Sequence, residues 1–234
     1  MSFKRVLFPQ VTLSGESLTS ALIGIGVRFG GSDPLIPPNI EDALYFGVLE
    51  AIEAPDYRLL ALLTDWFSIH SAAVNVDRLT KLVHKVESSL VRAYWGAIGQ
   101  SLMKDTRWKK MAQLAPSGRV DLFETGTDFL MGKHGGEDER FAGTCLRVPK
   151  GTLRHRPEDI LSPDALAARH PSYYYRVLIG PIYRADMWAY LERNPEASVA
   201  DVARSAYGSF TSAWAVKKDF GRIARAKQLL KKSA

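Results

Sequence analysis

The sequence predicts a mainly α-helical protein. Apolar residues recur at helical spacing over residues 39–115 and again after residue 171, and candidate N-cap residues precede these runs. Between the two regions the helical period fades and glycines become frequent. The chain has 234 residues, of which 46% are hydrophobic and 24% charged. This composition fits one or two globular domains and excludes a disordered or fibrous protein.

Residues 1–38 are expected to form an N-terminal arm with short strands. The stretch is apolar, but four glycines and three prolines fall between residues 24 and 38. Glycine weakens a helix, and proline removes a hydrogen-bond donor and clashes with the preceding turn. One long helix is therefore excluded here.

Residues 39–115 are expected to form a helical domain. Asn39 is a candidate N-cap, and Asp56 is placed to cap a second helix after Pro55 ends the first. Two further helical runs begin near Asn75 and Ser88. Four consecutive helices with short joints indicate a bundle.

Six aromatic residues of this domain allow two interpretations. They fill the core of the bundle, or they line an aromatic ligand pocket. Because they fall on the apolar stripes of the expected helices, we favour the core. The six are Trp66, Trp95, Trp108, Tyr45, Tyr57 and Tyr94.

Residues 116–170 are expected to form a linker with short strands. Glycines recur through this segment, and Phe141–Val148 shows approximate alternation of apolar and polar residues, which favours a strand. Cys145 is the single cysteine of the chain, so an intrachain disulfide and a thiolate-rich metal site are excluded. We expect Cys145 to be buried and unreactive.

No catalytic residue, metal ligand or cofactor is predicted, and we expect the protein not to be an enzyme. Gly30-Gly31-Ser32 fits the glycine turn of a nucleotidyltransferase, but no second carboxylate stands two residues after Asp42 to complete a metal-binding pair. No apolar stretch reaches the ~18 residues of a membrane span, and the first residues lack the apolar core of a signal peptide. We therefore expect a cytoplasmic protein with no membrane partner.

Residues 171–234 are expected to form a helix-turn-helix domain with a basic tail. Helical signals begin near Pro181, at Ser198 and after Ser209, and a glycine-containing turn separates the last two. Residues 217–234 hold seven Lys/Arg against a single Asp, an excess equal to the net charge of +6 of the whole chain. The basic character of the protein is thus a property of this segment.

Four short runs in this segment resemble the first three helices of a winged helix-turn-helix domain of the ArsR-like family. They are Tyr183–Leu191, Ser198–Arg204, the turn at 207–209, and Thr211–Phe220, and the resemblance covers about residues 176–223. It implies that the last helix is a recognition helix that binds DNA. A β-hairpin wing should follow that helix, yet Gly221–Ala234 has the pattern of a helix or a basic tail.

The leading functional hypothesis is therefore binding of double-stranded DNA by a homodimer, since palindromic sites need two-fold protein symmetry. The protein would act as a bacterial transcriptional regulator or an antitoxin-like repressor. The alternative is an adaptor in a defence or toxin–antitoxin complex, whose helical domain binds a protein partner and whose basic tail has no function. The residues expected to contact DNA are Thr211, Ser212, Trp214, Lys217, Lys218, Arg222, Arg225 and Lys227.

Overall fold

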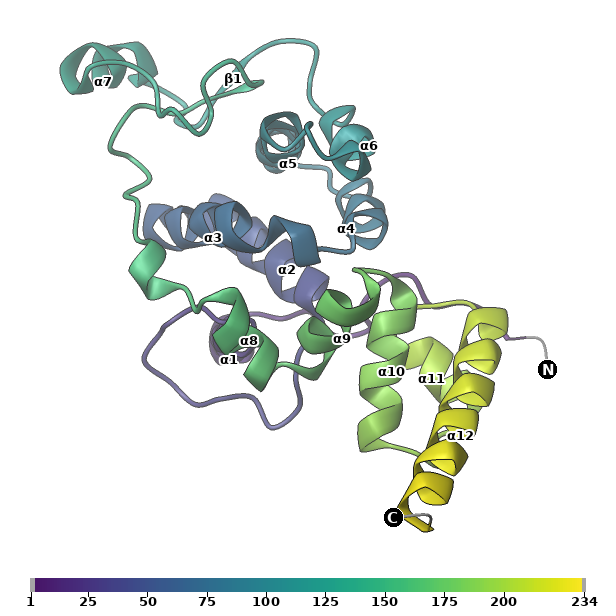
Figure 1. Cartoon of the computed structure of the whole chain (residues 1–234). Helices are drawn as coiled ribbons and strands as arrows, with labels where there is room; N and C mark the ends of the chain where they lie inside the picture. The colour runs from purple at the N-terminus through teal and green to yellow at the C-terminus, as the bar shows by residue number, and fades with distance from the viewer. Residues whose placement is uncertain (1–2, 233–234) are drawn as a thin grey trace. The chain divides into compact units, whose positions relative to one another are not determined.

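The fold is mainly helical, as expected (Figure 1). Its contacts divide the chain into two compact units. A computed structural model describes residues 3–232. One unit is Val11–Pro163, and the other combines residues 3–10 with residues 164–232. Among the described residues, twelve α-helices provide most of the regular structure and only two short strands are present.

The unit Val11–Pro163 is built around a group of helices that begins earlier in the chain than the sequence suggests. Its α-helices are α1 (Gly15–Gly24), α2 (Ile40–Glu53), α3 (Tyr57–His70), α4 (Val76–Val83), α5 (Ser89–Ser101), α6 (Lys109–Ala112) and α7 (Thr127–His134). Short 3₁₀ turns lie at Ser71–Ala73, Thr106–Trp108 and Pro157–Asp159, and the strands are β1 (Val120–Asp121) and β2 (Leu146–Arg147).

Side-chain caps fix the starts of the helices in the segment 39–115. The Asn39 side chain accepts a hydrogen bond from the backbone N–H of Asp42 at 3.1 Å, and Asp56 accepts one from that of Leu59 at 2.9 Å. Both caps were expected from sequence, because Asn and Asp satisfy the free N–H groups of a first helical turn. The four helices expected over this segment are confirmed as α2 to α5.

The large aromatic residues of this unit fill its core. Trp66, Trp95, Trp108 and Tyr94 are fully buried, and Phe67 packs edge-on against Trp95 and Trp108. The Trp66 indole donates a hydrogen bond to the carbonyl of Ile25 at 2.8 Å. The core interpretation is therefore confirmed for these four residues, while Tyr45 and Tyr57 are partly exposed.

The expectation of short strands over residues 1–38 is wrong. Residues 15–24 form helix α1. Elsewhere in the described residues 3–38, the only β-type pairing is an isolated bridge from Val27 to Ile160. The glycines and prolines of residues 24–38 lie at the end of α1 or after it, so they do not interrupt the helix. Gly24 is its last residue, and an added Cβ there would lie 2.7 Å from side-chain atoms of Pro34 and Pro38.

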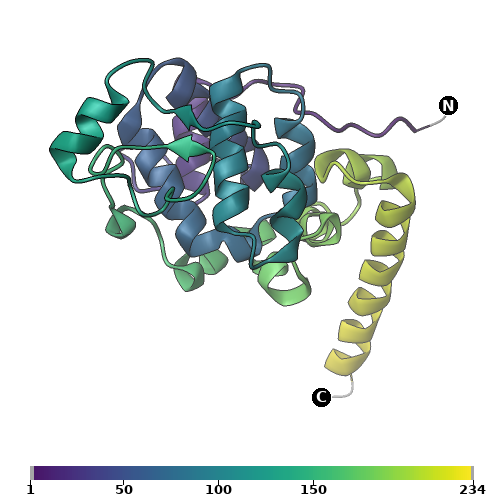
Figure 2. The same ribbon diagram turned by 90° about the horizontal axis from the view of Figure 1, so that it is seen from above.

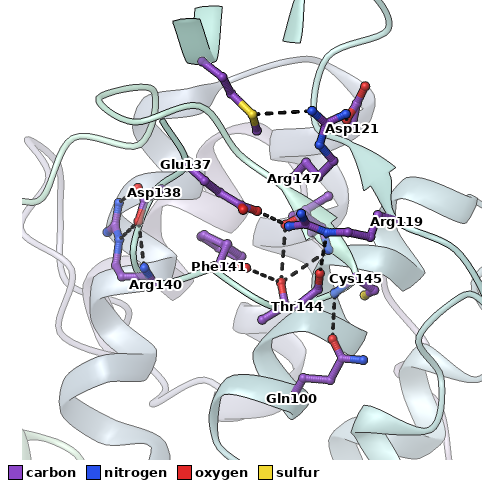
Figure 3. Close-up of polar contacts among 12 residues, drawn as sticks. Gln100, Arg119, Asp121, Glu137, Asp138, Arg140, Phe141, Thr144, Cys145 and Arg147 are labelled. Atoms are coloured by element: carbon purple, nitrogen blue, oxygen red, sulfur yellow. Dashed lines mark hydrogen bonds and ion pairs between the residues drawn. The ribbon is translucent and has the colours of Figure 1, made fainter. Parts of the chain in front are cut away.

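The expected strand Phe141–Val148 is also largely wrong. Only β2 is extended, and it pairs in parallel with β1 through Val120↔Leu146 and Asp121↔Arg147. The Thr144 hydroxyl donates to the carbonyl of Phe141 at 2.8 Å and so closes a turn before β2. Figure 3 shows this turn beside Arg119, which donates to the Thr144 carbonyl and pairs with Glu137.

Most of the expected linker 116–170, residues 116–163, packs within the same unit as the helices before it, and residues 164–170 belong to the other unit. Asp65 on α3 is fully buried, and it accepts hydrogen bonds from the Arg140 guanidinium at 2.8 Å and from the backbone N–H of Arg156 at 2.6 Å. Cys145 is buried as expected, and burial raises the pKa of its thiol. Polar contacts take the place of regular secondary structure in holding this segment.

In the second unit, all regular secondary structure described after residue 163 is helical. Its helices are α8 (Pro163–Arg169), whose first residue falls in the other unit, α9 (Pro171–Ile179), α10 (Tyr183–Arg193), α11 (Val199–Ser205) and α12 (Phe210–Lys232). No helix within residues 3–232 combines the length and apolar character needed to cross a membrane.

Candidate nucleic-acid interface

Helices α10, α11 and α12 form a three-helix arrangement around a small apolar core. Met187 and Leu191 of α10, Val202 of α11, and Ala213 and Val216 of α12 are all fully buried in this core. Small residues on α11 and α12 let the two helices approach closely. The three expected helical signals of this region are thus confirmed as helices.

The start of α11 is fixed by its cap. The Ser198 hydroxyl accepts a hydrogen bond from the backbone N–H of Asp201 at 3.2 Å and donates one to the Asp201 carboxylate at 2.6 Å. The hydrogen bond from Ser198 and the nearby guanidinium of Arg204 hold the pKa of the Asp201 carboxyl below its ordinary value. The sequence predicted this N-cap correctly.

A tight turn over residues 206–209 joins α11 to α12. Tyr207 adopts a left-handed backbone conformation with φ of 54°, which only a few per cent of non-glycine residues do. An added Cβ on the next residue, Gly208, would lie 2.0 Å from the terminal methyl group of Met187. Gly208 therefore lets the turn pack directly on the buried core.

An N-terminal segment supports this turn. Arg5 donates from Nε to the carbonyl of Tyr207 at 2.8 Å, and its guanidinium lies 4.7 Å from the centre of the Tyr183 ring. Phe3 packs against Phe210 with ring centroids 5.5 Å apart. Sequence reasoning missed these residues, since Arg5 and Tyr207 are 202 positions apart and no local pattern connects them.

The first residues of α12 are held by Ser209. Its hydroxyl accepts a hydrogen bond from the backbone N–H of Ser212 at 3.1 Å and donates one to the Ser212 hydroxyl at 2.8 Å. Ser212 was expected to contact DNA, but its backbone and side chain both take part in this cap. It does not belong to the outward face described next.

Five of the eight expected residues lie on one exposed stripe of α12. The stripe is opposite the buried Ala213 and Val216, and its spacing of three, four, four and three residues follows one side of a helix. All five side chains are exposed. We call this stripe the outward face; its residues are Thr211, Trp214, Lys218, Arg222 and Arg225.

Two expected cations lie elsewhere. Lys217 is half-buried and donates a hydrogen bond from Nζ to the carbonyl of Ala197, which anchors α12 to the loop between α10 and α11. Lys227 is exposed but lies on another side of α12, where it lines a groove. Spacing alone does not separate these two from the outward face, because it does not reveal which side of the helix is packed.

The charges of the outward face are weakly restrained. Lys218 lies 5.1 Å from the centre of the Trp214 ring, and Arg222 approaches Asp219 at 3.5 Å. Exposed ion pairs of this kind contribute ~1 kcal/mol or less, so both cations remain available to other anions. The unit as a whole is basic, with 14 Lys/Arg against 6 Asp/Glu, whereas Val11–Pro163 has 17 against 19.

Within residues 3–232, the β-hairpin wing of a winged helix-turn-helix domain is not present where it was expected, after the candidate recognition helix. Helix α12 is continuous over 23 residues, and no strand occurs in the described part of the chain after Phe210. Residues 221–232 contain no proline. Their one glycine, Gly221, does not interrupt α12. The expected basic tail is thus the second half of the candidate recognition helix.

Comparisons of the chain with protein-family models, with curated proteins and with solved structures find no match.

Proposed function

We propose that the protein binds double-stranded DNA through the outward face of α12. The observation that carries the proposal is the position of this face. It lies on the second helix of a tight helix-turn-helix, it is exposed, and it contains one threonine, one tryptophan and three cations. An α-helix fits the major groove of B-form DNA with its first residues toward the bases.

The two halves of the outward face have different tasks in this proposal. Thr211 and Trp214 lie in the first turns of α12, where side chains of a recognition helix reach base edges. Lys218, Arg222 and Arg225 follow along the same stripe and neutralise phosphates, which supplies affinity that is independent of sequence. The resemblance to ArsR-like domains supports this assignment, and with it a role as a bacterial transcriptional regulator or antitoxin-like repressor that acts as a homodimer.

An adaptor that binds another protein is the second candidate. It is favoured by large apolar side chains that are exposed on the unit Val11–Pro163, among them Leu35, Met103 and Phe129. In that case the cations of α12 are only solvated, and the chain has no affinity for DNA.

Charge removal on the outward face tests the proposal against this alternative. The variant Lys218→Gln/Arg222→Gln/Arg225→Gln changes only exposed side chains, so it should fold normally. We expect it to bind a labelled random-sequence duplex at least tenfold more weakly than the unaltered protein at about 50 mM salt.

A matched control removes three exposed cations from the other unit, with the variant Lys104→Gln/Lys110→Gln/Lys133→Gln. Its net charge equals that of the test variant, so any difference in affinity reports position and not total charge. Absence of DNA binding by the unaltered protein at this salt concentration, or equal affinities of the two variants, would contradict the proposal.

A further inference from the structure

An open apolar groove of about 810 Å³ lies within the second unit, formed by α9, α10 and α12. Trp188 of α10 stands between Tyr175 of α9 and Phe220 of α12, with ring centroids 6.2 Å and 5.4 Å away. Leu178 and Ile223 line the groove as well, and they are 63% and 46% exposed. Aromatic and large aliphatic side chains gathered in this way are typical of the centre of a protein interface.

The second half of α12 borders this groove together with α9 and α10. Every described side chain from Arg222 to Lys231 is exposed, and the C-terminal end of the helix extends past the end of α10 (Figures 1 and 2). Residues 221–232 span ~18 Å of helix. Most helical stability in proteins comes from packing of an apolar face, so packing by a partner would stabilise this half of α12.

The charged side chains at the two ends of the groove are complementary to each other. Arg184 lines one end of the groove and pairs at 3.2 Å with Asp219, which lies beside the groove. Glu192 and Lys227 line the groove eight residues further along α10 and α12, respectively, which is ~12 Å of helix in each case. Each end therefore carries one acid and one base.

We infer that a second copy of this chain occupies the groove, related to the first by a two-fold axis near Trp188 and Ile223. Such an axis brings each end of the groove to the opposite end of its partner, so that Arg184 faces the partner's Glu192 and Asp219 faces the partner's Lys227. The apolar row of α12 that includes Ile223 packs against the same row of the partner, and the two grooves face each other. An isologous interface requires this self-complementarity, and a groove for an unrelated protein does not.

The interface leaves the outward face of α12 uncovered. Phe220, Ala224 and Lys227 line the groove on the side of α12 that continues from the buried Val216, whereas Lys218 and Arg225 lie on the opposite side. The dimer thus presents two outward faces at once. In this respect the inference deepens the proposed function, but dimer formation is measured without DNA and can fail separately from it.

Sedimentation velocity of the full chain in the absence of DNA tests the inference. We expect a species of twice the mass of the 26.0 kDa chain at micromolar concentration, and no larger assembly as concentration rises. The variants Ile223→Glu and Leu178→Glu alter exposed side chains of the groove and should each raise the dimer dissociation constant at least tenfold. Phe129→Glu, at an exposed apolar residue of the other unit, should leave the dissociation constant unchanged.

A charge exchange tests the two-fold arrangement itself. Glu192→Arg and Arg184→Glu should each weaken the dimer, and the double variant should bind more tightly than either, because the pair is remade across the axis although the pair of Arg184 with Asp219 within each copy is lost. Circular dichroism of each variant verifies that the helices are retained. A monomeric unaltered protein, growing filaments, or a double variant weaker than both single variants would overturn the inference.

Discussion

Burial of His70 makes the stability of the unit Val11–Pro163 depend on pH. His70 ends α3, is 1% exposed, and lies 4.8 Å from the ring centre of Trp66. Its Nε2 is 2.9 Å from the carbonyl oxygen of Leu161, to which the neutral ring donates a hydrogen bond. Burial lowers the pKa of His70 from 6.5 to about 4, since a charged ring loses its hydration in this position.

The direction of the effect follows from the two pKa values. As pH falls below 6.5, the unfolded chain takes up a proton that the folded chain does not bind until about pH 4. The stabilisation by neutral His70 is therefore complete above the unfolded pKa and is lost as pH falls through this window. The difference between the folded and unfolded pKa values lowers the free energy of unfolding by about 2 kcal/mol between about pH 7.5 and 5.

Urea unfolding followed by tryptophan fluorescence measures this loss. His70→Gln cannot titrate, so the difference in free energy of unfolding between the unaltered protein and this variant should shrink by about 2 kcal/mol over that pH range. His84→Gln, at an exposed histidine, should show the pH dependence of the unaltered protein. A constant difference for His70→Gln would refute the reasoning.

Two further predictions concern packing in each unit. In Gly99→Ala the new Cβ would lie 2.4 Å from the backbone nitrogen of Ala112. Because backbone atoms cannot rotate aside, we expect α5 and α6 to separate and the free energy of unfolding to fall by about 3 kcal/mol. Gly118→Ala, where the new Cβ meets open space, should lower it by less than about 0.5 kcal/mol. Arg176 and Asp186 form a buried pair with two hydrogen bonds of 2.9 Å, so Asp186→Asn should cost about 3–5 kcal/mol in thermal or urea unfolding. The same change in the exposed pair with Lys81, Asp77→Asn, should cost under about 1 kcal/mol, and similar losses at the two sites would show that burial is not the cause.

The parts of the fold that depend on neighbouring residues were predictable from the sequence. Asn39, Asp56 and Ser198 cap helices because each lies three residues before the N–H group that it accepts from. A helix was expected to begin near Pro181, and α10 does begin at Tyr183, after Gly180 with a φ of 93°. Local chemistry decides features of this kind.

Features that depend on tertiary contacts were not predictable. The short strand β2 requires β1, which is more than twenty residues away in the chain, and the hydrogen bond from Arg5 to Tyr207 spans nearly the whole sequence. The candidate site was predicted in the same partial way. Its helix and its cations were found, but the use of Lys217 as an anchor depends on the position of the loop at Ala197.

The salt dependence of DNA binding tests the central claim most directly. Fluorescence anisotropy of a labelled duplex, read between about 50 and 200 mM salt, gives the slope of log K against log salt, which changes by about 0.9 for each phosphate contact. If Lys218, Arg222 and Arg225 each neutralise one phosphate, the slope for the triple glutamine variant should be shallower than that of the unaltered protein by about 2.7. Binding by the unaltered protein with a slope that the variant leaves unchanged would show that the outward face of α12 does not contact DNA.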